Sequence, residues 1–189
     1  MSRTRSPAAT SFARPSVAEL EAARGKQLRD VIAPGLKVLF CGINPGLYSA
    51  ATGHHFARPG NRFWPALHAA GFTPRLLHPS EKQVLLDAGY GLTNLVERAT
   101  AGAAELAPGE FVAGRKRLAT KVRRYRPRVI AFLGMGAYRH AFGTPEARLG
   151  EQPERFEGAR VWLLPSPSGL NAAYQLDALV GLLRRLKRA

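Results

Sequence analysis

Apolar and polar residues alternate along the chain in blocks that predict short buried strands separated by helices. Runs rich in Val, Leu, Ile and Phe are typical of strands buried on both faces of a sheet, and they cover residues 36–41, 90–96, 129–133 and 161–164. Apolar residues at helical spacing fill most of the intervals between these runs. Because strands that alternate with helices form layered α/β folds, we expect a largely parallel sheet covered by helices.

Capping residues and apolar spacing predict where the helices begin and end. Ser16 and Glu19 have the spacing of a capping box, and the apolar face of the helix that they would start extends to Val31, before the Pro34-Gly35 turn. The other helices are expected at residues 61–70 with Asn61 as cap, at 80–88 with a capping box from Ser80 to Gln83, at 108–125, at 137–142 and at 176–186.

The first fifteen residues differ in composition from the rest of the chain. They carry three arginines among Ser, Thr, Pro and Ala without apolar periodicity, which predicts a disordered basic arm over residues 1–15. The remaining residues, 16–189, are numerous enough to bury one hydrophobic core, so we expect a single domain.

The sequence argues against a membrane or secreted protein. No apolar run approaches the roughly 18 residues that a membrane-spanning helix needs, and the N-terminal residues have no apolar segment typical of a secretory signal. Cys41 is the only cysteine, so the chain can form neither an internal disulfide nor a four-cysteine metal site. We therefore expect a cytoplasmic location.

The strong positive charge indicates an anionic partner. The formal net charge is +15, and eight cations lie within residues 115–128. Such a run is also typical of a solvated helix face, and in either case it adds salt-dependent attraction to phosphates. His54 and His55 have no cysteine or carboxylate cluster beside them, so we expect no metal site.

Two turns that follow predicted strands carry the candidate chemistry. Gly42-Ile43-Asn44-Pro45-Gly46 follows the first strand, and Pro165-Ser166-Pro167-Ser168-Gly169-Leu170 follows the last. In parallel sheets ligands bind beyond the carboxyl ends of the strands, which is where both turns would lie. The first turn fits neither the dinucleotide-binding glycine fingerprint nor a phosphate-binding loop with its lysine, which weakens the hypothesis of a small-molecule nucleotide enzyme.

Together with Phe-Ala-Arg-Pro at residues 56–59 and Asn-Arg-Phe-Trp at 61–64, these turns resemble those of the mismatch-specific uracil-DNA glycosylases, bacterial relatives of thymine-DNA glycosylase. The resemblance runs from about Leu36 to the C-terminal helix. It implies a uracil-DNA glycosylase-like fold, a three-layer α/β/α sandwich with a short central, largely parallel sheet, and no cofactor or metal. It also implies a nucleoid-associated repair enzyme of a bacterium.

Cleavage of an N-glycosidic bond develops positive charge on the sugar and negative charge on the departing base, and it needs a placed water. An amide can hold a water but cannot abstract its proton, so the resemblance assigns Asn44 the positioning of water. It assigns Phe56 the flat wall against which a flipped base stacks, and Ile43 a backbone contact to the pyrimidine edge. Tyr48 would limit the space near the pyrimidine 5-methyl group. The alternative for Asn44 is an ordinary turn residue before proline, and the alternative for Phe56 is an ordinary core phenylalanine.

The second turn would enter the DNA. Leu170 suits an apolar wedge that fills the space left by the flipped nucleotide, while Ser168 and Gly169 would hold phosphates. Asn171 would read the widowed guanine together with Leu170. Two residues depart from the pattern of this family. Ser166 replaces an asparagine of a close relative, and Ala172, two positions after the wedge, stands where the family often has an arginine. Recognition of the opposite base is therefore expected to be weaker.

The resulting hypothesis is a monomeric, monofunctional DNA glycosylase of double-stranded DNA. It would flip uracil out of mismatched duplexes, with thymine or damaged pyrimidines such as ethenocytosine as further candidates, and leave an abasic site for base excision repair. The catalytic turn has no lysine, so no Schiff base is expected. A non-catalytic DNA-binding module that recognises distorted duplex remains the alternative. Asp87, Asn94 and Glu97 flank the second strand, and the sequence does not say which of them assists.

Overall fold

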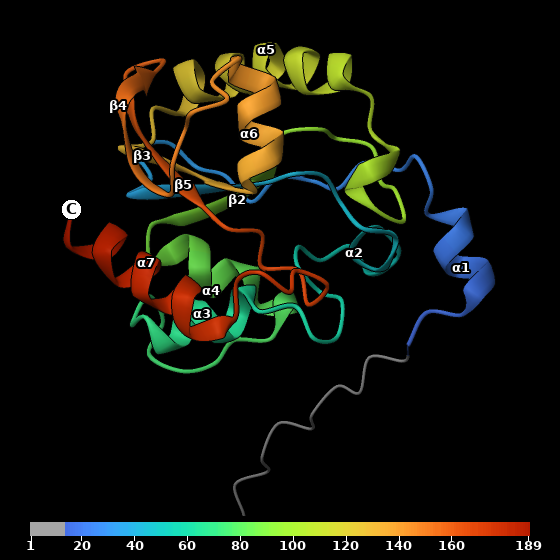
Figure 1. Ribbon diagram of the computed structural model, residues 1–189. Coiled ribbons are helices and arrows are strands. Elements are labelled where there is room, and N and C mark those ends of the chain that lie inside the picture. Colours follow the sequence, from blue (N-terminus) through green and yellow to red (C-terminus); the bar gives the residue numbers. More distant parts are fainter. Residues whose placement is uncertain (1–13) are drawn as a thin grey trace, which may run out of the picture.

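The central layer is one sheet. The computed structural model describes residues 14–189, and within them five strands pair in the order β2-β1-β3-β5-β4 (Figure 1). Neighbouring strands are parallel except β4, which runs antiparallel to β5. The strands are β1 (Val38–Gly42), β2 (Tyr90–Asn94), β3 (Val129–Leu133), β4 (Gly150–Phe156) and β5 (Ala159–Leu164).

Helices cover both faces of this sheet, so the predicted three-layer α/β/α sandwich is confirmed (Figure 1). One face carries α5 (Pro108–Tyr125) and α6 (Met135–Phe142). The other carries α3 (Phe63–Ala69), α4 (Lys82–Asp87) and α7 (Leu176–Arg188). Two short helices, α1 (Val17–Ala22) and α2 (Leu47–Thr52), contact each other beside the sheet, and 3-10 turns occupy Pro79–Glu81 and Ala103–Glu105.

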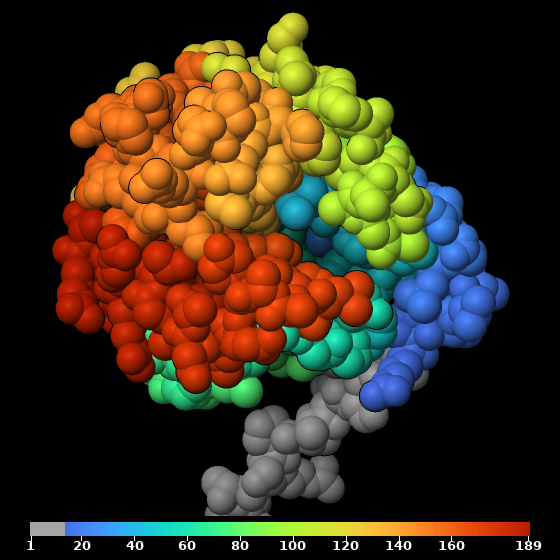
Figure 2. Space-filling view, viewed as in Figure 1, coloured from blue at the N-terminus to red at the C-terminus, as the bar shows by residue number. Residues whose placement is uncertain are grey.

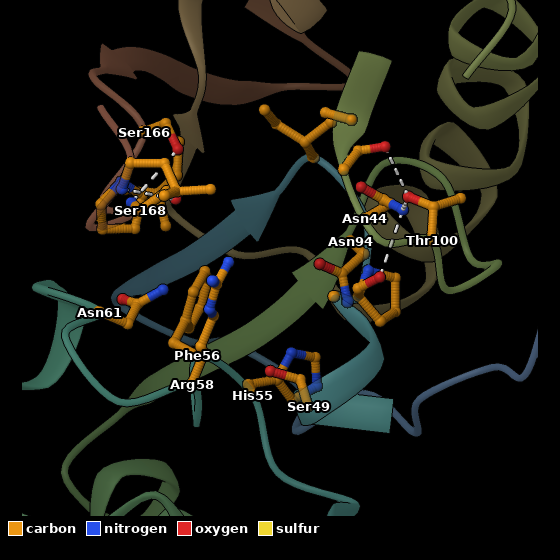
Figure 3. A pocket seen from close by; sticks show the side chains of 18 of the residues that line it. Asn44, Ser49, His55, Phe56, Arg58, Asn61, Asn94, Thr100, Ser166 and Ser168 are labelled. Carbon is orange, nitrogen blue, oxygen red and sulfur yellow. Dashed lines mark hydrogen bonds between the residues drawn. The ribbon is translucent and has the colours of Figure 1, made fainter. Parts of the chain in front are cut away.

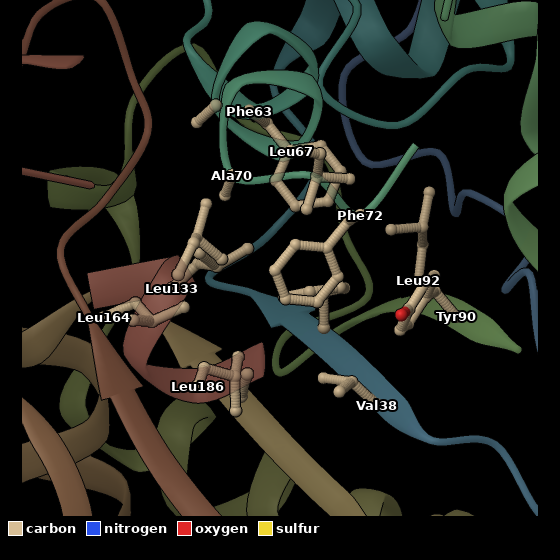
Figure 4. Close-up of a cluster of buried hydrophobic side chains, with 14 of the residues drawn as sticks. Val38, Phe63, Leu67, Ala70, Phe72, Tyr90, Leu92, Leu133, Leu164 and Leu186 are labelled. Atoms are coloured by element: carbon tan, nitrogen blue, oxygen red, sulfur yellow. The ribbon is translucent and has the colours of Figure 1, made fainter. Parts of the chain in front are cut away.

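Successive residues of the inner strands contribute to opposite faces of the sheet. On β1, Val38 and Phe40 join the core under α3 and α7, while Leu39 and Cys41 join the core under α5 and α6. Figure 4 shows the first of these cores, where Phe63, Leu67 and Phe72 pack with the side chains of β1 and β2. Every position of β1, β2 and β3 is buried, as expected for parallel strands covered on both sides.

Several predicted elements are confirmed closely. The helix over 108–125 and the strand over 129–133 have the predicted bounds, and α7 extends the predicted C-terminal helix to Arg188. Asn61 assists the start of α3, since its Oδ1 accepts a hydrogen bond from the Phe63 amide at 2.9 Å. The predicted capping box at Ser80 is wrong, because the box forms two residues earlier and caps the turn at Pro79–Glu81.

The helix predicted from Ser16 to Val31 is also wrong beyond its first turns. Its capping box forms, but α1 ends at Ala22, and Gly25 adopts a positive φ of 75° that a helix cannot accommodate. Val31 instead exchanges two backbone hydrogen bonds of 2.8 Å with Leu92 of β2. Tertiary pairing with the sheet therefore outweighs the helical spacing of this segment.

Among the α-helices and strands, the sequence patterns predict neither β4 nor α2. β4 is an edge strand with an irregular register between Glu151 and Arg155 and mostly exposed side chains, so it lacks the apolar run that marks the inner strands. The short helix α2 directly follows the Gly42–Gly46 turn. No helix within residues 14–189 combines the length and apolar character needed to cross a membrane.

Candidate active site

The turns after β1 and β5 meet at one edge of the sheet. β1 and β5 flank β3 and run parallel to it, so their carboxyl ends, Gly42 and Leu164, lie on the same side. Between the turns is a pocket of about 370 Å³. In Figure 2 the surface is hollowed between the orange-red segment that follows β5 and the yellow-green segment that precedes α5. Residues 165–175, called the wedge loop below, form one wall.

Most of the residues singled out from the sequence come together in this pocket. Its lining includes Ile43, Asn44, Phe56, Ser166, Ser168, Leu170 and Asn171. Gly169 and Tyr48 are not part of that lining. Gly169 lies in the wedge loop, while Tyr48 is a half-buried residue of α2. The structure therefore brings Asn44 and Leu170 to one cavity and leaves Tyr48 outside it.

Hydrogen bonds fix the orientation of the Asn44 amide. Its Nδ2 donates to the backbone oxygens of Arg98 at 3.0 Å and Pro45 at 3.3 Å, and to Thr100 Oγ1 at 2.7 Å. Backbone oxygens only accept, so the nitrogen end of the amide must face them. The oxygen end is turned to the other side, toward the pocket (Figure 3). No residue in the described part of the chain donates a hydrogen bond to this Oδ1.

The same contacts explain why this turn carries an amide rather than a carboxylate. In an aspartate at position 44, an anionic oxygen would replace Nδ2 and face the backbone oxygens of Pro45 and Arg98. These oxygens only accept hydrogen bonds, so neither could donate one to the carboxylate. Unpaired, partly buried charge of this kind is costly. The fold thus selects a side chain that can hold a water through its oxygen but cannot act as a general base.

Thr100 was not identified from the sequence, and it holds the Asn44 amide directly. Its hydroxyl donates to the Gly102 carbonyl at 2.9 Å, which leaves its lone pairs for Asn44. The backbone of Thr100 is tied to the Asn44 turn as well, since its N–H donates to Pro45 O at 3.1 Å. A threonine among alanines and glycines carries no sequence signal for this role, because its partner lies 56 residues away.

Ion pairs anchor the segment that contains Thr100. The Arg98 guanidinium binds both carboxylate oxygens of Glu110 at 2.6 and 2.7 Å, and it also donates to the Glu105 carbonyl. Hydrogen bonds from Arg98 lower the pKa of Glu110 to about 2. This bidentate pair joins the first turn of α5 to the backbone that supports Asn44.

Phe56 forms a flat wall of the pocket. Its ring stacks on Phe63, the first residue of α3, with centroids 4.1 Å apart and planes inclined by 27°. The Phe56 backbone has a positive φ of 54°, which is unusual for a bulky residue. Gly42 allows the close approach, because a Cβ there would lie 3.2 Å from Phe56 Cζ. The ring is thus held from behind while it lines the cavity.

Of the three polar residues near the second strand, the structure brings only Asn94 to the pocket. Asn94 ends β2 and is 7% exposed, and no described residue forms a hydrogen bond with its side-chain amide. Asp87 accepts a hydrogen bond from Gln83 instead. Glu97 pairs with Lys121, whose Nζ also contacts Asp30 at 2.7 Å. An amide without a protein partner at the end of a strand is suited to pair with a ligand.

The wedge loop is held together by its own polar side chains. The side-chain amide of Asn171 donates a hydrogen bond to Ser166 O at 3.0 Å, and the backbone N–H of Leu170 donates one to Ser168 Oγ at 3.3 Å. Leu170 itself is 74% exposed, although it lies on the rim of the pocket. The loop therefore presents an apolar side chain to solvent on an ordered backbone.

The pocket is nearly neutral. The residues that the structure describes contribute no Asp, Glu or Lys to its lining, and Arg58 supplies a cation at an exposed position. Burial lowers the pKa of His55 to about 4, so the imidazole is uncharged at neutral pH. Within residues 14–189, no group of three or more His, Cys, Asp or Glu side chains is arranged to hold a metal ion.

The fold and the pocket together define an α/β protein with a pocket at the carboxyl edge of its parallel strands, where ligands bind in such sheets. The sequence model of the uracil DNA glycosylase superfamily matches residues 29–187, and the chain therefore belongs to that superfamily. Its fold is similar to the solution NMR structure of a candidate uracil DNA glycosylase from Methanosarcina acetivorans. That comparison gives a TM-score of 0.58 at 20% sequence identity and covers 86% of this chain and 98% of the other.

Proposed function

We propose that the protein is a monofunctional DNA glycosylase that flips uracil out of mismatched duplex DNA and hydrolyses its N-glycosidic bond. The observation that carries this proposal is that Asn44 and Leu170, 126 positions apart in the sequence, line one pocket. A water held by an amide and an apolar residue able to enter a base stack would then serve the same extruded nucleotide. Membership in the uracil DNA glycosylase superfamily supports this assignment.

The pocket suits a neutral pyrimidine. Its volume of about 370 Å³ is in the range of small-ligand sites. The Phe56 ring offers a stacking surface, and the unpaired amide of Asn94 offers one donor and one acceptor group, which complement the O4 and N3–H of uracil. Thymine and ethenocytosine share the pyrimidine ring and are further candidate substrates.

The chemistry follows from the absence of a carboxylate in the described lining. Without a general base, the bond between base and sugar breaks first, and the base leaves with the bonding electron pair as an anion. Water held on Asn44 Oδ1 then adds to the cationic sugar and loses its proton to solvent. No described lysine lines the pocket to form a Schiff base, so the product is an abasic site in an intact strand. We expect slow turnover, because the attacking water is positioned but not deprotonated.

Binding of duplex DNA would depend on the wedge loop and on charge. Leu170 replaces the extruded nucleotide in the stack, and the net charge of +15 favours the phosphate backbone. Ser166 and Ala172 would leave the readout of the opposite base weak, so discrimination between mismatched and paired uracil is expected to be modest.

The decisive experiment is single-turnover excision from a G·U duplex, with alkali to cleave the abasic sites that form. The wild-type protein should convert the uracil strand, while Asn44→Ala should lose at least about a hundredfold in rate. Both proteins should bind equally to a duplex with 2′-fluorodeoxyuridine, which resists hydrolysis and checks that the variant folds. Tight binding by the wild type without any strand cleavage would contradict the proposal and support a non-catalytic DNA-binding module.

A further inference from the structure

Arg62 directs its hydrogen-bond donors at the wedge loop. Its side chain lies at the start of α3, and no acidic residue within residues 14–189 pairs with it. Its guanidinium instead donates to five oxygens of the loop: Ser168 O at 3.2 Å, Asn171 O at 2.9 Å, Tyr174 O at 3.0 Å, Gly169 O at 3.5 Å and Gln175 Oε1 at 3.0 Å. The Arg62 backbone N–H also donates to Pro167 O at 2.9 Å.

A second contact joins the same two segments. A Cβ atom on Gly169 would lie 2.7 Å from Gly60 O, so the backbones of the wedge loop and of the loop after Phe56 are in close contact there. Leu170 is 74% exposed and has little packing of its own to fix its position. The position of the wedge relative to Phe56 is therefore set by Arg62 and by this backbone contact.

The hydrogen bonds of Arg62 also determine which way the loop's amides point. In a trans peptide the C=O and N–H bonds are directed oppositely. Because the carbonyls of Ser168 and Asn171 face the guanidinium, the N–H groups of Gly169 and Ala172 face the other way. Neither amide donates a hydrogen bond to a described residue. The Arg62 guanidinium on one side of the loop thus leaves these two N–H groups free on the other side, where they can donate hydrogen bonds to a phosphate.

We propose that Arg62 is a positioning residue that links the base-stacking wall to the wedge. This inference rests on the proposed function. The guanidinium holds Leu170 at a fixed distance from Phe56, so that entry of the leucine into the duplex and capture of the base take place together. Arg62 contacts neither the base nor the sugar in this proposal, and it acts through the wedge loop alone.

The test is a double-mutant cycle between Arg62→Lys and Leu170→Ala on a G·U duplex with 2-aminopurine beside the uracil. Lysine keeps the charge but has no planar fork to reach several carbonyls. Arg62→Lys should slow single-turnover excision and the rise in 2-aminopurine fluorescence between about tenfold and a hundredfold. In the Leu170→Ala background the same change should cost less than about twofold, since the wedge is already lost.

Two controls separate positioning from stability. Arg139 also donates twice to one backbone oxygen, that of Ala147, so Arg139→Lys removes comparable bonds from α6 and should leave both rates unchanged. Gly169→Ala disturbs the contact with Gly60 while it keeps both the guanidinium and the Gly169 carbonyl that accepts from it, and it should reproduce the Arg62→Lys defect. It serves as the second variant if Arg62→Lys does not fold, as judged by its circular dichroism and melting curve.

The two proposals can fail separately. Absence of excision by the wild type would overturn the proposed function, while the fluorescence cycle would still report on the link between Arg62 and Leu170. Multiplicative effects of the two substitutions would overturn the inference, because independent effects mean that Arg62 does not act through the wedge. An Arg62→Lys protein with wild-type rates would overturn it as well.

Discussion

Replacement of Thr100 by valine tests how far the reaction depends on the orientation of the Asn44 amide. Thr100 is 1% exposed, and its hydroxyl accepts a hydrogen bond from Asn44 Nδ2 and donates one to Gly102 O. Valine has nearly the same shape without the hydroxyl, so the substitution removes these two bonds and little packing. Asn44 keeps its contacts with the backbone oxygens of Arg98 and Pro45.

The expected magnitude follows from the groups that lose their partners. An unsatisfied polar group in a buried position costs about 1–3 kcal/mol, so the free energy of unfolding should fall by roughly 2 kcal/mol. The amide should also rotate more freely, and we expect kcat to fall about tenfold, which corresponds to about 1.4 kcal/mol of transition-state stabilisation. KM should change by less than about twofold, because Phe56 and Leu170 are untouched.

Single-turnover excision and thermal unfolding together measure these effects. Thr100→Ser keeps the hydroxyl and should retain most of the wild-type rate, so it is the matched control. A Thr100→Val protein that excises uracil at the wild-type rate would show that Asn44 needs no support from this side chain. Equal defects in the serine and valine variants would show that the loss of rate does not depend on the Thr100 hydroxyl, which would refute the reasoning.

Two further predictions concern the packing of Gly42 against Phe56 and Asn94 and the pH dependence of stability. Gly42→Ala would place a Cβ 2.7 Å from Asn94 Oδ1 and 3.2 Å from Phe56 Cζ, so the rate of excision should fall at least about tenfold. A Cβ at Gly136 would meet no heavy atom within 4 Å, so Gly136→Ala is the control and should keep the wild-type rate. Equal rates in the Gly42→Ala and Gly136→Ala proteins would contradict the assigned packing. Burial lowers the pKa of His55 from 6.5 to about 4, so the unfolded chain binds a proton that the folded chain does not. Stability should therefore be undiminished above pH 6.5 and fall by about 3 kcal/mol as the pH drops to 4. Denaturant unfolding of His55→Gln, which can still donate a hydrogen bond, should lack most of this loss, and an unchanged loss would assign it to other groups.

The sequence by itself determined the layered architecture and indicated that the two turns would meet at one edge of the sheet. Inner parallel strands are buried on both faces, so β1 and β3 appear as uninterrupted apolar runs, and the apolar residues of the long helix α5 recur at helical spacing. Parallel strands bring their carboxyl ends to one edge, which is why the turns containing Asn44 and Leu170 could be expected to meet.

Local pattern failed where tertiary contacts outweighed it. The segment from Gly25 to Val31 has helical spacing, but it follows the sheet because Val31 pairs with Leu92. β4 has no apolar run, since an edge strand with exposed charges needs none. Tyr48 is close to Asn44 in sequence, yet the course of α2 leaves it outside the pocket lining.

The supports of the site could be found only in three dimensions. Thr100 lies 56 positions from Asn44, and Arg62 lies 106 to 113 positions from the loop oxygens that its side chain holds. A hydrogen bond depends on the distance and direction between two atoms, and neither is encoded in the spacing of residue types along the chain. Residue types therefore indicated which groups could do chemistry, while the folded backbone decided that Asn94 rather than Asp87 or Glu97 faces the pocket.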